Sequence, residues 1–578
     1  MLNVKEYKGG SFINENISVD EVFTPEEFTD EHYMMADMAE KFMMKEVMPA
    51  LEKIEAQQFD QTVRLLKKAG ELGLLGVDVP EQYGGLDLDK VSSCIISEKV
   101  ALGRSFGITF GGQVGIGSLP IVFFGTNEQK EAYLPYIVTG EKIGAYALTE
   151  PTSGTDALAA KTSARLSDCG KYYILNGEKQ WITNSAFADF FIVFAKVDGQ
   201  QFTAFIVERD YEGVSIGPEE KKMGLKGSST CSLILDNVKV PVNNVLGDIG
   251  KGHVIAFNIL NIGRHKISAT ALGMSKRAIE LSVKYAKERK QFGRSLSEFR
   301  LIQNKIADMA IKTYVNESMI YRTAGAIEKG LEEGKGDIAK TIAEYAVECS
   351  VNKVFSTEAL DFIVDEAVQI HGGYGYMSEY EVEALYRDAR IYRIFEGTNE
   401  INRMLIASTL LRKYKDQLSE MIESRKIEED LLLHESIPLG DEKQHLYRAK
   451  SLFLLIANIV QKQYIEKEKE QELLACLADM AIEIYAIESA LLRTEKAMAQ
   501  NGVDKEEQKK NYVQVYVQET IQQLLGRSLN VLPYLKDDEQ LLKIVYQNIE
   551  KSNQSLVDII TIKRKIAEKI IRNEKYVV

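Results

Sequence analysis

The chain has 578 residues, more than a single hydrophobic core usually supports, so its length predicts several domains. Hydrophobic residues make up 45% and charged residues 27% of the sequence, as in an ordinary globular protein, and the formal net charge is −14. This charge excludes a nucleic-acid backbone as the main partner, because phosphate binding needs a basic face.

The cysteines, the first residues and the most apolar C-terminal run indicate where in the cell the protein is located. The five cysteines are scattered and form no CxxC or Cys/His pair at metal-ligand spacing, which indicates a reducing compartment and no metal site. The first residues lack the layout of a signal or transit peptide. The most apolar C-terminal run, Leu452 to Val460, is shorter than the ~20 residues of a spanning helix. We therefore expect a cytoplasmic protein.

Four zones follow one another along the chain. Residues 27–143 have apolar side chains at helical spacing and predict an N-terminal helical domain. Residues 144–252 contain short β-rich runs and the hairpin dipeptide Asn176-Gly177, which predict a compact antiparallel barrel or sandwich. Residues 253–413 return to long helices. Residues 414–578 predict an extra C-terminal helical domain, with helices over 441–500, 505–531 and 538–575. The predicted fold class is α+β, and mostly α.

Two loops of the β-rich zone have the chemistry to bind a flavin. After Tyr146 the chain runs through Pro151 and Gly154 with small hydroxyl residues, and such a loop offers amide and hydroxyl donors to a pyrophosphate. A plain Ser-rich turn is an equally frequent explanation. Trp181 is the only tryptophan, and its ring could pack beside an isoalloxazine with the Thr183 hydroxyl on a ring atom. A lone tryptophan is more often part of a core.

Glu396 is the candidate general base. It lies in a mostly apolar stretch between Phe395 and Gly397, where desolvation would raise the pKa of its carboxyl group. A base of that strength is what removal of a weakly acidic C–H proton requires. On this stretch alone, a carboxylate that caps a helix end is the more frequent case.

Six motifs in order resemble the acyl-CoA dehydrogenase family over roughly residues 30–410. The resemblance implies the acyl-CoA dehydrogenase fold: a helical N-terminal domain, a central β-domain and a third, helical domain, with FAD between the last two. The motifs are Leu148-Thr149-Glu150-Pro151 with Gly154-Thr155-Asp156, Trp181-Ile182-Thr183-Asn184, Lys222 to Thr230, Glu288 to Gly293, Gln369 to Gly375, and Phe395-Glu396-Gly397-Thr398.

The resemblance assigns roles residue by residue. Glu396 matches the catalytic base. In some relatives the base instead precedes an arginine on an earlier helix, where this chain has Gly263 before Arg264, and glycine cannot take up a proton. Arg264 would help to hold the substrate, although a surface arginine is the default interpretation. Glu400 departs from the amide side chain of some relatives. The implied FAD contacts are Leu148, Thr149, Thr155, Trp181, Thr183, Thr398 and Glu400, with Arg289, Phe292, Gln369, Gly372 and Gly373 reaching FAD across a dimer interface. The implied substrate contacts are Thr155, Gly112, Asn261, Arg264, Phe395 and Gly397.

The resemblance also implies a reaction. Glu396 would remove the α-proton of a fatty acyl-CoA while the β-hydrogen leaves as hydride to flavin N5, giving trans-2-enoyl-CoA, the first step of fatty acid β-oxidation. Electrons would pass to an electron-transfer flavoprotein. Gly112 aligns with a bulky carboxylate of medium-chain relatives, so the glycine-rich segment Thr109 to Gly117 predicts room for a long chain; close helix packing is the alternative.

The C-terminal zone resembles the very-long-chain branch of the family, in which an added domain accompanies a homodimer. Members of that branch contact a membrane after the core. The corresponding stretch here, Asp416 to Glu442, is acidic and unsuited to anionic lipid. The basic end from Lys563 to Arg572 is a better candidate for weak peripheral contact, although a solvated helix face is the more frequent case. An acyl-CoA oxidase and a scaffold protein that retains the fold are the competing functions.

Overall fold

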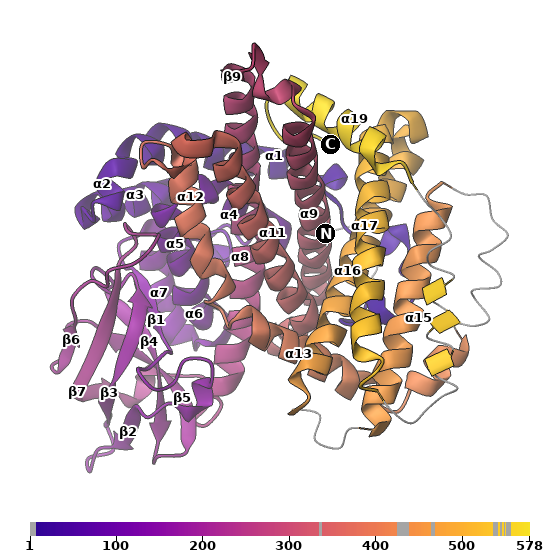
Figure 1. Cartoon of the computed structure of the whole chain (residues 1–578). Coiled ribbons are helices and arrows are strands. Elements are labelled where there is room, and N and C mark those ends of the chain that lie inside the picture. The colour runs from indigo at the N-terminus through magenta and orange to yellow at the C-terminus, as the bar shows by residue number, and fades with distance from the viewer. Residues whose placement is uncertain are drawn as a thin grey trace.

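The computed structural model describes residues 7–578 except 334–337, 425–437, 464–468, 536–541, 544–545, 548 and 551–556. Long helices dominate, and a single large sheet lies at one end of the molecule (Figure 1). The α+β fold class, with a β-domain between helical domains and an extra C-terminal helical domain, is thereby confirmed.

The first helical part packs its amphipathic helices beside the sheet (Figure 1). One stretch of it, Ser105–Phe124, is the single candidate among the described residues that is long and apolar enough to span a membrane, but 78% of its apolar window is buried inside the protein. Such burial is the behaviour of a core helix. A π-helical turn, Gly112–Gly117, interrupts this stretch. The helices are α1 (Asp30–Phe42), α2 (Leu51–Glu55), α3 (Phe59–Glu71), α4 (Lys90–Val100), α5 (Ser105–Gly111), α6 (Leu119–Phe124) and α7 (Asn127–Thr139).

The β-domain is one eight-stranded sheet of order β6-β7-β3-β2-β4-β5-β8, with β1 paired to β4. It is mixed and not purely antiparallel as predicted, because β4 pairs in parallel with both β1 and β2. Strand β4 is almost entirely apolar and buried, as expected of a strand covered on both faces. The strands are β1 (Gly144–Ala147), β2 (Ser163–Leu166), β3 (Tyr172–Thr183), β4 (Phe190–Val197), β5 (Gln201–Glu208), β6 (Val214–Ile216), β7 (Thr230–Pro241) and β8 (Val245–Leu246).

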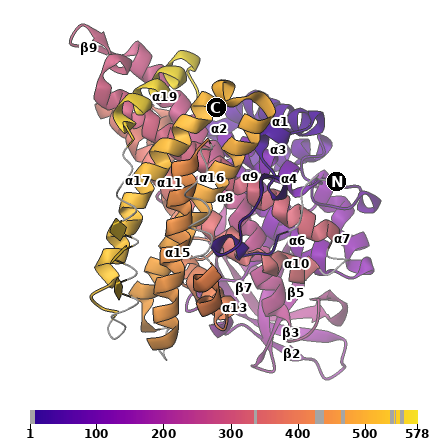
Figure 2. The same cartoon turned by 90° about the vertical axis from the view of Figure 1, so that its right-hand side faces the viewer.

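The third part is built around α8 (Gly252–Glu288), a helix of 37 residues at the centre of the molecule (Figure 1). Its packing against α4, α9 and α11 buries most of its length. A short hairpin of β9 (Lys290–Gln291) and β10 (Arg294–Ser295) follows it and projects from the molecule in both views (Figures 1 and 2). The remaining helices are α9 (Arg300–Glu333), α10 (Ile338–Glu344), α11 (Ala346–His371), α12 (Glu381–Ala389) and α13 (Asn399–Tyr414).

The C-terminal extension covers α9 and α13 with the helices α15 (Gly440–Gln463), α16 (Gln471–Asn501), α17 (Glu507–Val531) and α19 (Ile559–Asn573). The range 441–500 thus holds two helices, and part of the range 538–575 lies outside the described residues. Buried ion pairs join the extension to α9: Arg322 to Glu488 and Arg493 to Glu317, both at 2.7 Å. These buried charges are paired, as their location requires.

The basic end of the chain does not form a free amphipathic surface. Lys563 is buried and its Nζ lies 2.7 Å from Asp308 of α9. The apolar face of α19, with Ile566 and Ile570, is buried against α9 and α17. The face that would enter a lipid surface is therefore covered by protein. Residues 425–437 of the acidic stretch from Asp416 to Glu442 lie outside the described residues.

Candidate active site

Glu396 occupies a tight turn between a short 3₁₀ helix that ends at Arg393 and the start of α13. Glu396 and Gly397 both have left-handed backbone angles, with φ of +56° and +81°. Glycine adopts this conformation freely, but a residue with a side chain pays on the order of 1–3 kcal/mol for it. Thr398 then caps α13 by accepting a hydrogen bond from the Ile401 N–H at 3.4 Å. The turn aims the Glu396 side chain away from both helices and toward α8.

The Glu396 carboxylate lies against α8. Its Oε2 atom is buried and has no hydrogen-bond partner within the described residues. A Cβ atom placed on Gly263 of α8 would lie 2.9 Å from Oε2 and 3.2 Å from Cδ. Any side chain at position 263 would displace the carboxylate, so the absence of a side chain at Gly263 leaves room for it. An acceptor without a donor is the arrangement that a waiting base requires.

Burial sets the strength of this base. Desolvation raises the pKa of Glu396 to about 7, opposed by the charges of Arg264 and Lys353. Desolvation also lowers the pKa of Lys353 to about 7, so Lys353 is only partly charged at neutral pH. Tyr146 at the end of β1 is also within electrostatic reach, since its pKa is raised by burial and by the Glu396 charge. At neutral pH a large fraction of Glu396 is therefore ionised and ready to accept a proton.

Three side chains hold the backbone of the Glu396 turn. Arg264 donates from Nε to the Glu396 carbonyl oxygen at 2.9 Å. Lys353 of α11 donates from Nζ to the Gly397 carbonyl oxygen at 2.9 Å, and Asn402 reaches the same oxygen at 2.8 Å. These donors satisfy carbonyls that the left-handed turn removes from helical bonding. They also fix the base relative to α8 and α11.

Arg264 is not the surface residue that the default interpretation expected. It is only 6% exposed, and its Nη1 donates to the Asn261 side-chain oxygen at 2.9 Å. Burial lowers its pKa, opposed by the charge of Glu396. Asn261 and Arg264 thus lie beside the base as predicted, with Arg264 bonded to the turn itself. Direct contact of either side chain with substrate stays a prediction.

The predicted flavin-ring residues gather where β1 and β3 meet the first helical part. The Gln180 N–H of β3 donates to the Thr149 carbonyl at 2.9 Å, which joins the two loops. Trp181 has a φ of +59° at a register shift of β3 and is 58% exposed, so it is not a core tryptophan. An apolar ring held outside the core on a strained backbone is available to stack on a planar ligand. Leu148 is buried, while Thr155 lies on an exposed loop.

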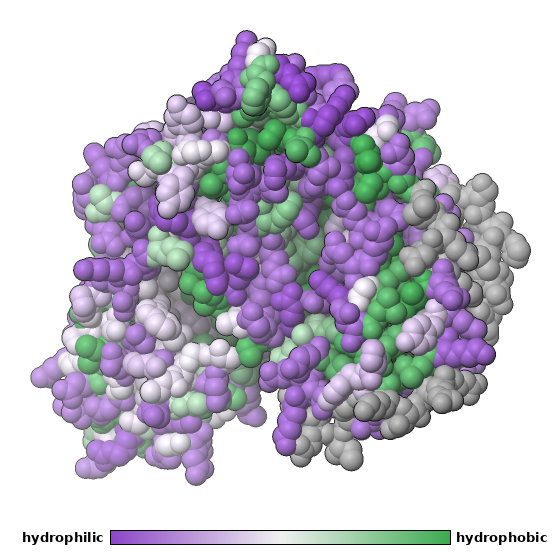
Figure 3. Space-filling model, viewed as in Figure 1, coloured by the Kyte–Doolittle hydropathy of each residue, from purple (hydrophilic) through white to green (hydrophobic). Residues whose placement is uncertain are grey.

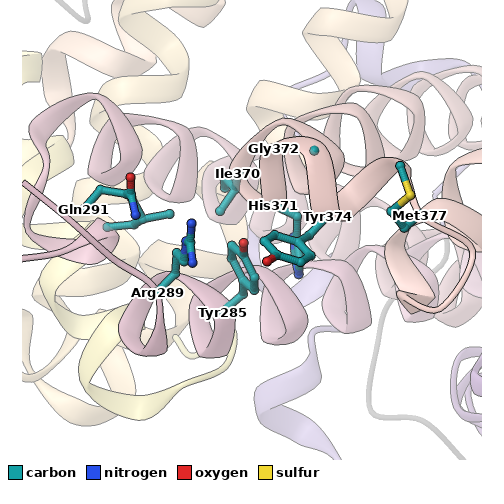
Figure 4. A pocket seen from close by; sticks show the side chains of 10 residues that line it. Tyr285, Arg289, Gln291, Ile370, His371, Gly372, Tyr374 and Met377 are labelled. Carbon is teal, nitrogen blue, oxygen red and sulfur yellow. The ribbon is translucent and has the colours of Figure 1, made fainter.

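A second cluster of predicted residues lines a cavity of about 480 Å³ at the far end of α8 (Figure 4). Arg289, at the end of α8, faces this cavity together with Gly372 and Gly373 at the end of α11. A Cβ atom on either glycine would meet no atom within 4 Å, so both present open backbone to the cavity. A guanidinium beside exposed amides suits a pyrophosphate. Phe292 at the hairpin tip is 93% exposed, and Gln369 is exposed near the cavity.

The base and the cavity lie far apart along α8. From Gly263, beside the base, to Arg289, at the cavity, α8 runs 26 residues without a break. At ~1.5 Å per residue this is about 39 Å. Figures 1 and 2 show the hairpin at one end of the molecule and the sheet at the other. Figure 3 shows apolar side chains gathered on the surface near the hairpin end of the molecule.

The glycine-rich segment does not open at the predicted position. A Cβ atom on Gly112 would lie 3.0 Å from Asn184 Nδ2 and 3.4 Å from Thr183 Cγ2, so this glycine serves the close approach of the helix to β3. Gly111 meets nothing within 4 Å, and the buried Gly115 meets only Lys266 Cδ at 3.9 Å. Open space therefore lies beside Gly111, and the surroundings of Gly115, four residues further on, are loosely packed.

Several residues around the base were missed in the sequence. Lys353 and Asn402 hold the turn. In the β-domain, Lys179 was missed as well, and it is buried with its Nζ on the Leu148 carbonyl at 3.1 Å. Polar neighbours in the sequence, such as Asn352 and Glu178, gave no signal that these lysines are buried. Glu400 is exposed in the first turn of α13, where its own backbone N–H lowers its pKa. Among the described residues no group of His, Cys, Asp or Glu could hold a metal ion.

Comparison with known proteins covers the whole chain. Three acyl-CoA dehydrogenase domain models match in order: the N-terminal domain at residues 29–141, the middle domain at 145–238 and the C-terminal domain at 250–411. A further acyl-CoA dehydrogenase C-terminal domain model matches residues 448–549 of the extension.

Individual relatives agree with the domain models. A Bacillus subtilis (strain 168) protein named "Probable acyl-CoA dehydrogenase" is 52% identical over 99% of this chain and 98% of its own length. The human mitochondrial very long-chain specific acyl-CoA dehydrogenase is 37% identical over 74% of this chain and 69% of its own. A crystal structure of an acyl-CoA dehydrogenase complexed with FAD from Bacillus anthracis is 51% identical, has a TM-score of 0.96 and covers 99% of this chain and 100% of that one.

Proposed function

The chain belongs to the acyl-CoA dehydrogenase family, and we propose that it oxidises long-chain fatty acyl-CoA to trans-2-enoyl-CoA with Glu396 as the base. The observation that carries this proposal is the Glu396 carboxylate, whose buried Oε2 lies against Gly263 and accepts from no donor in the described part of the chain. The enzyme is an FAD-dependent oxidoreductase, as its family and its FAD-complexed structural relative show. The reaction would be the first step of fatty acid β-oxidation.

The residues of this chain divide the chemistry between them. Glu396 takes the proton from the α-carbon of the thioester onto its carboxylate, and burial keeps water from competing for the site. Arg264 and Lys353 keep the turn in place during the transfer. FAD, when bound, supplies the hydride acceptor. Its ring would be held by Leu148, Thr149, Trp181 and Thr183, and its ADP half by Arg289, Gly372 and Gly373.

The preference for long chains is supported by the glycines of the segment Thr109 to Gly117. A Cβ atom on Gly111 would meet open space, and one on the buried Gly115 would touch only Lys266 Cδ, at 3.9 Å. An acyl chain gains about 0.8 kcal/mol for each CH₂ that it buries, so such space favours longer substrates. Gly112, which the sequence singled out, contributes by letting the helix approach β3.

The distance along α8 supports the proposal of a homodimer. Gly263, beside the base, lies about 39 Å along the helix from Arg289 at the cavity. A second copy could bring its own cavity to the first copy's ring site, and the exposed Phe292 would then be covered. An electron-transfer flavoprotein is the proposed electron acceptor, and a cytoplasmic location is proposed on the sequence grounds given above.

The test is anaerobic mixing of the holoenzyme with palmitoyl-CoA while the visible flavin spectrum is recorded. Bleaching by wild type, and binding of FAD and substrate without bleaching by Glu396→Gln, are the expected results. Normal bleaching by Glu396→Gln would disprove the assignment of the base. A series of acyl-CoA lengths tests the preference, and preferential bleaching by short chains would contradict it. Hydrogen peroxide formed at the rate of aerobic turnover would instead indicate an acyl-CoA oxidase.

A further inference from the structure

A continuous series of polar contacts starts in the C-terminal extension. Asp479 of α16 accepts a hydrogen bond from Arg403 Nε of α13 at 2.7 Å. Arg403 donates its two remaining nitrogens to both carboxylate oxygens of Glu358 in α11, at 2.8 and 3.0 Å. Arg527 of α17 also pairs with Asp479, at 3.1 Å. The Asp479 carboxylate therefore links α16 and α17 of the extension to α13 of the core.

The series continues to the catalytic turn. Asn399 donates from Nδ2 to Glu358 at 3.0 Å and accepts from Lys353 Nζ at 2.7 Å on its Oδ1. Lys353 in turn donates to the Gly397 carbonyl at 2.9 Å. Lys353 and Asn399 are almost completely buried. Every step from Asp479 to the Gly397 carbonyl, next to Glu396, is thus a direct hydrogen bond within the described residues.

We propose that Asp479 is a positioning residue for Glu396, and that the C-terminal extension uses it to fix the geometry of the base. The proposal rests on the proposed function, because it takes Glu396 to be the base. The proposal gives the C-terminal extension, in which Asp479 lies, a role in the reaction.

The physical reason lies in the geometry of each contact. A guanidinium that binds a carboxylate through two parallel hydrogen bonds has a defined orientation, and Asp479 holds the third nitrogen, Nε. Arg403 is thereby fixed from two sides, and with it Glu358 and Asn399. A lysine side chain is flexible, so the position of Lys353 depends on its acceptors. A strained turn persists only when its surroundings hold it.

Another interdomain contact offers a matched comparison. Asp308 of α9 pairs with Lys563 of α19 at 2.7 Å, and its side chain is 21% exposed against 20% for Asp479. Each carboxylate joins the extension to the core through a cation. Of the two, Asp479 is the one with the series of contacts that ends at Gly397. Asp308→Ala therefore controls for general loosening of the extension.

The experiment compares full-length holoenzymes carrying Asp479→Ala, Asp308→Ala, Lys353→Met, and Asp479→Ala combined with Lys353→Met. Anaerobic single-turnover reduction of the flavin by palmitoyl-CoA is measured across pH, and amide hydrogen exchange is followed over residues 395–399. We expect Asp479→Ala to slow flavin reduction about tenfold, with half-saturation by substrate nearly unchanged. It should also speed exchange in the turn, while Asp308→Ala matches wild type in both measurements.

The combined variant tests whether both residues act in one series. It should be no slower than Lys353→Met alone, and both should shift the pH midpoint upward, because Lys353 lowers the pKa of Glu396. Asp479→Glu should restore part of the rate.

Three outcomes would overturn the proposal. They are equal behaviour of Asp479→Ala and Asp308→Ala, fully additive losses in the combined variant, and unchanged exchange over residues 395–399 in Asp479→Ala. Failure of wild type to reduce its flavin with any acyl-CoA would instead disprove the proposed function. The exchange comparison would still decide whether Asp479 and the turn are coupled.

Discussion

Gly263→Ala should separate catalysis from folding. The substitution adds one carbon atom, which would lie 2.9 Å from Oε2 and 3.2 Å from Cδ of Glu396. Contacts below 3.0 Å are not tolerated, so one of the two groups must move. The Cβ atom is fixed by the helix α8, whereas the carboxylate is the end of a rotatable side chain. The base will therefore move, and the fold will remain.

Gly263→Ala should leave the stability unchanged or slightly raised and should lower the rate. Glycine inside a helix is about 1 kcal/mol less favourable than alanine, so the variant should be as stable as wild type or slightly more stable. Normal carbon–oxygen separation requires the carboxylate to shift by roughly 0.5 Å, and misplacement by 1 Å costs about a hundredfold in rate. We expect flavin reduction to slow by about ten- to a hundredfold.

The assay is anaerobic stopped-flow reduction of the flavin by palmitoyl-CoA, with thermal unfolding measured on the same preparation. Gly526→Ala is the matched control, because Gly526 lies inside α17 and a Cβ atom there meets nothing within 4 Å. It should gain stability and keep its rate. A Gly263→Ala enzyme that reduces its flavin at the wild-type rate would refute the idea that this contact places the base.

Four further results are expected. Because burial raises the pKa of Glu396 to about 7, flavin reduction should rise with pH up to about that value and then level off in stopped-flow experiments. In urea unfolding, wild type should lose stability relative to Glu396→Gln as the pH rises toward about 7. The reason is that the folded state holds the Glu396 proton more tightly than the unfolded chain does. Trp181→Ala should leave apoprotein unfolding unchanged, because the ring is 58% exposed, and should weaken FAD binding about tenfold by fluorescence titration. Gly115→Leu should fill the space beside Lys266 and lower kcat/KM about tenfold for palmitoyl-CoA but less than about twofold for butyryl-CoA. Unchanged values in any of these assays would contradict the corresponding assignment.

Local patterns were enough to predict the fold class and to make Glu396 a candidate, and the family resemblance then assigned it as the base. Helical spacing and the hairpin dipeptide at Asn176-Gly177 distinguished helical zones from the β-domain. The flanks of Glu396 indicated desolvation, and the structure confirms that burial raises its pKa. The zones depend on neighbours in the chain, whereas the burial of Glu396 is completed by distant residues such as Gly263.

Contacts between distant segments could not be predicted. The parallel pairing of β1 and β2 with β4 leaves no mark in an alternating pattern. Arg264 and Lys353 look like surface cations in sequence, because their acceptors are carbonyls of a turn more than 40 residues away. Four glycines in one segment do not reveal which of them faces space, and the structure assigns Gly112 to close packing.

Hydrogen–deuterium exchange on a substrate analogue tests the role of Glu396 most directly. In 3-thiapalmitoyl-CoA sulfur replaces the β-carbon, so no hydride can leave, but the α-hydrogens stay acidic. In D₂O, wild-type holoenzyme should exchange these α-hydrogens for deuterium, as followed by mass spectrometry. Glu396→Gln should bind the analogue and leave its α-hydrogens in place. Exchange by Glu396→Gln at the wild-type rate would contradict the assignment of Glu396 as the base.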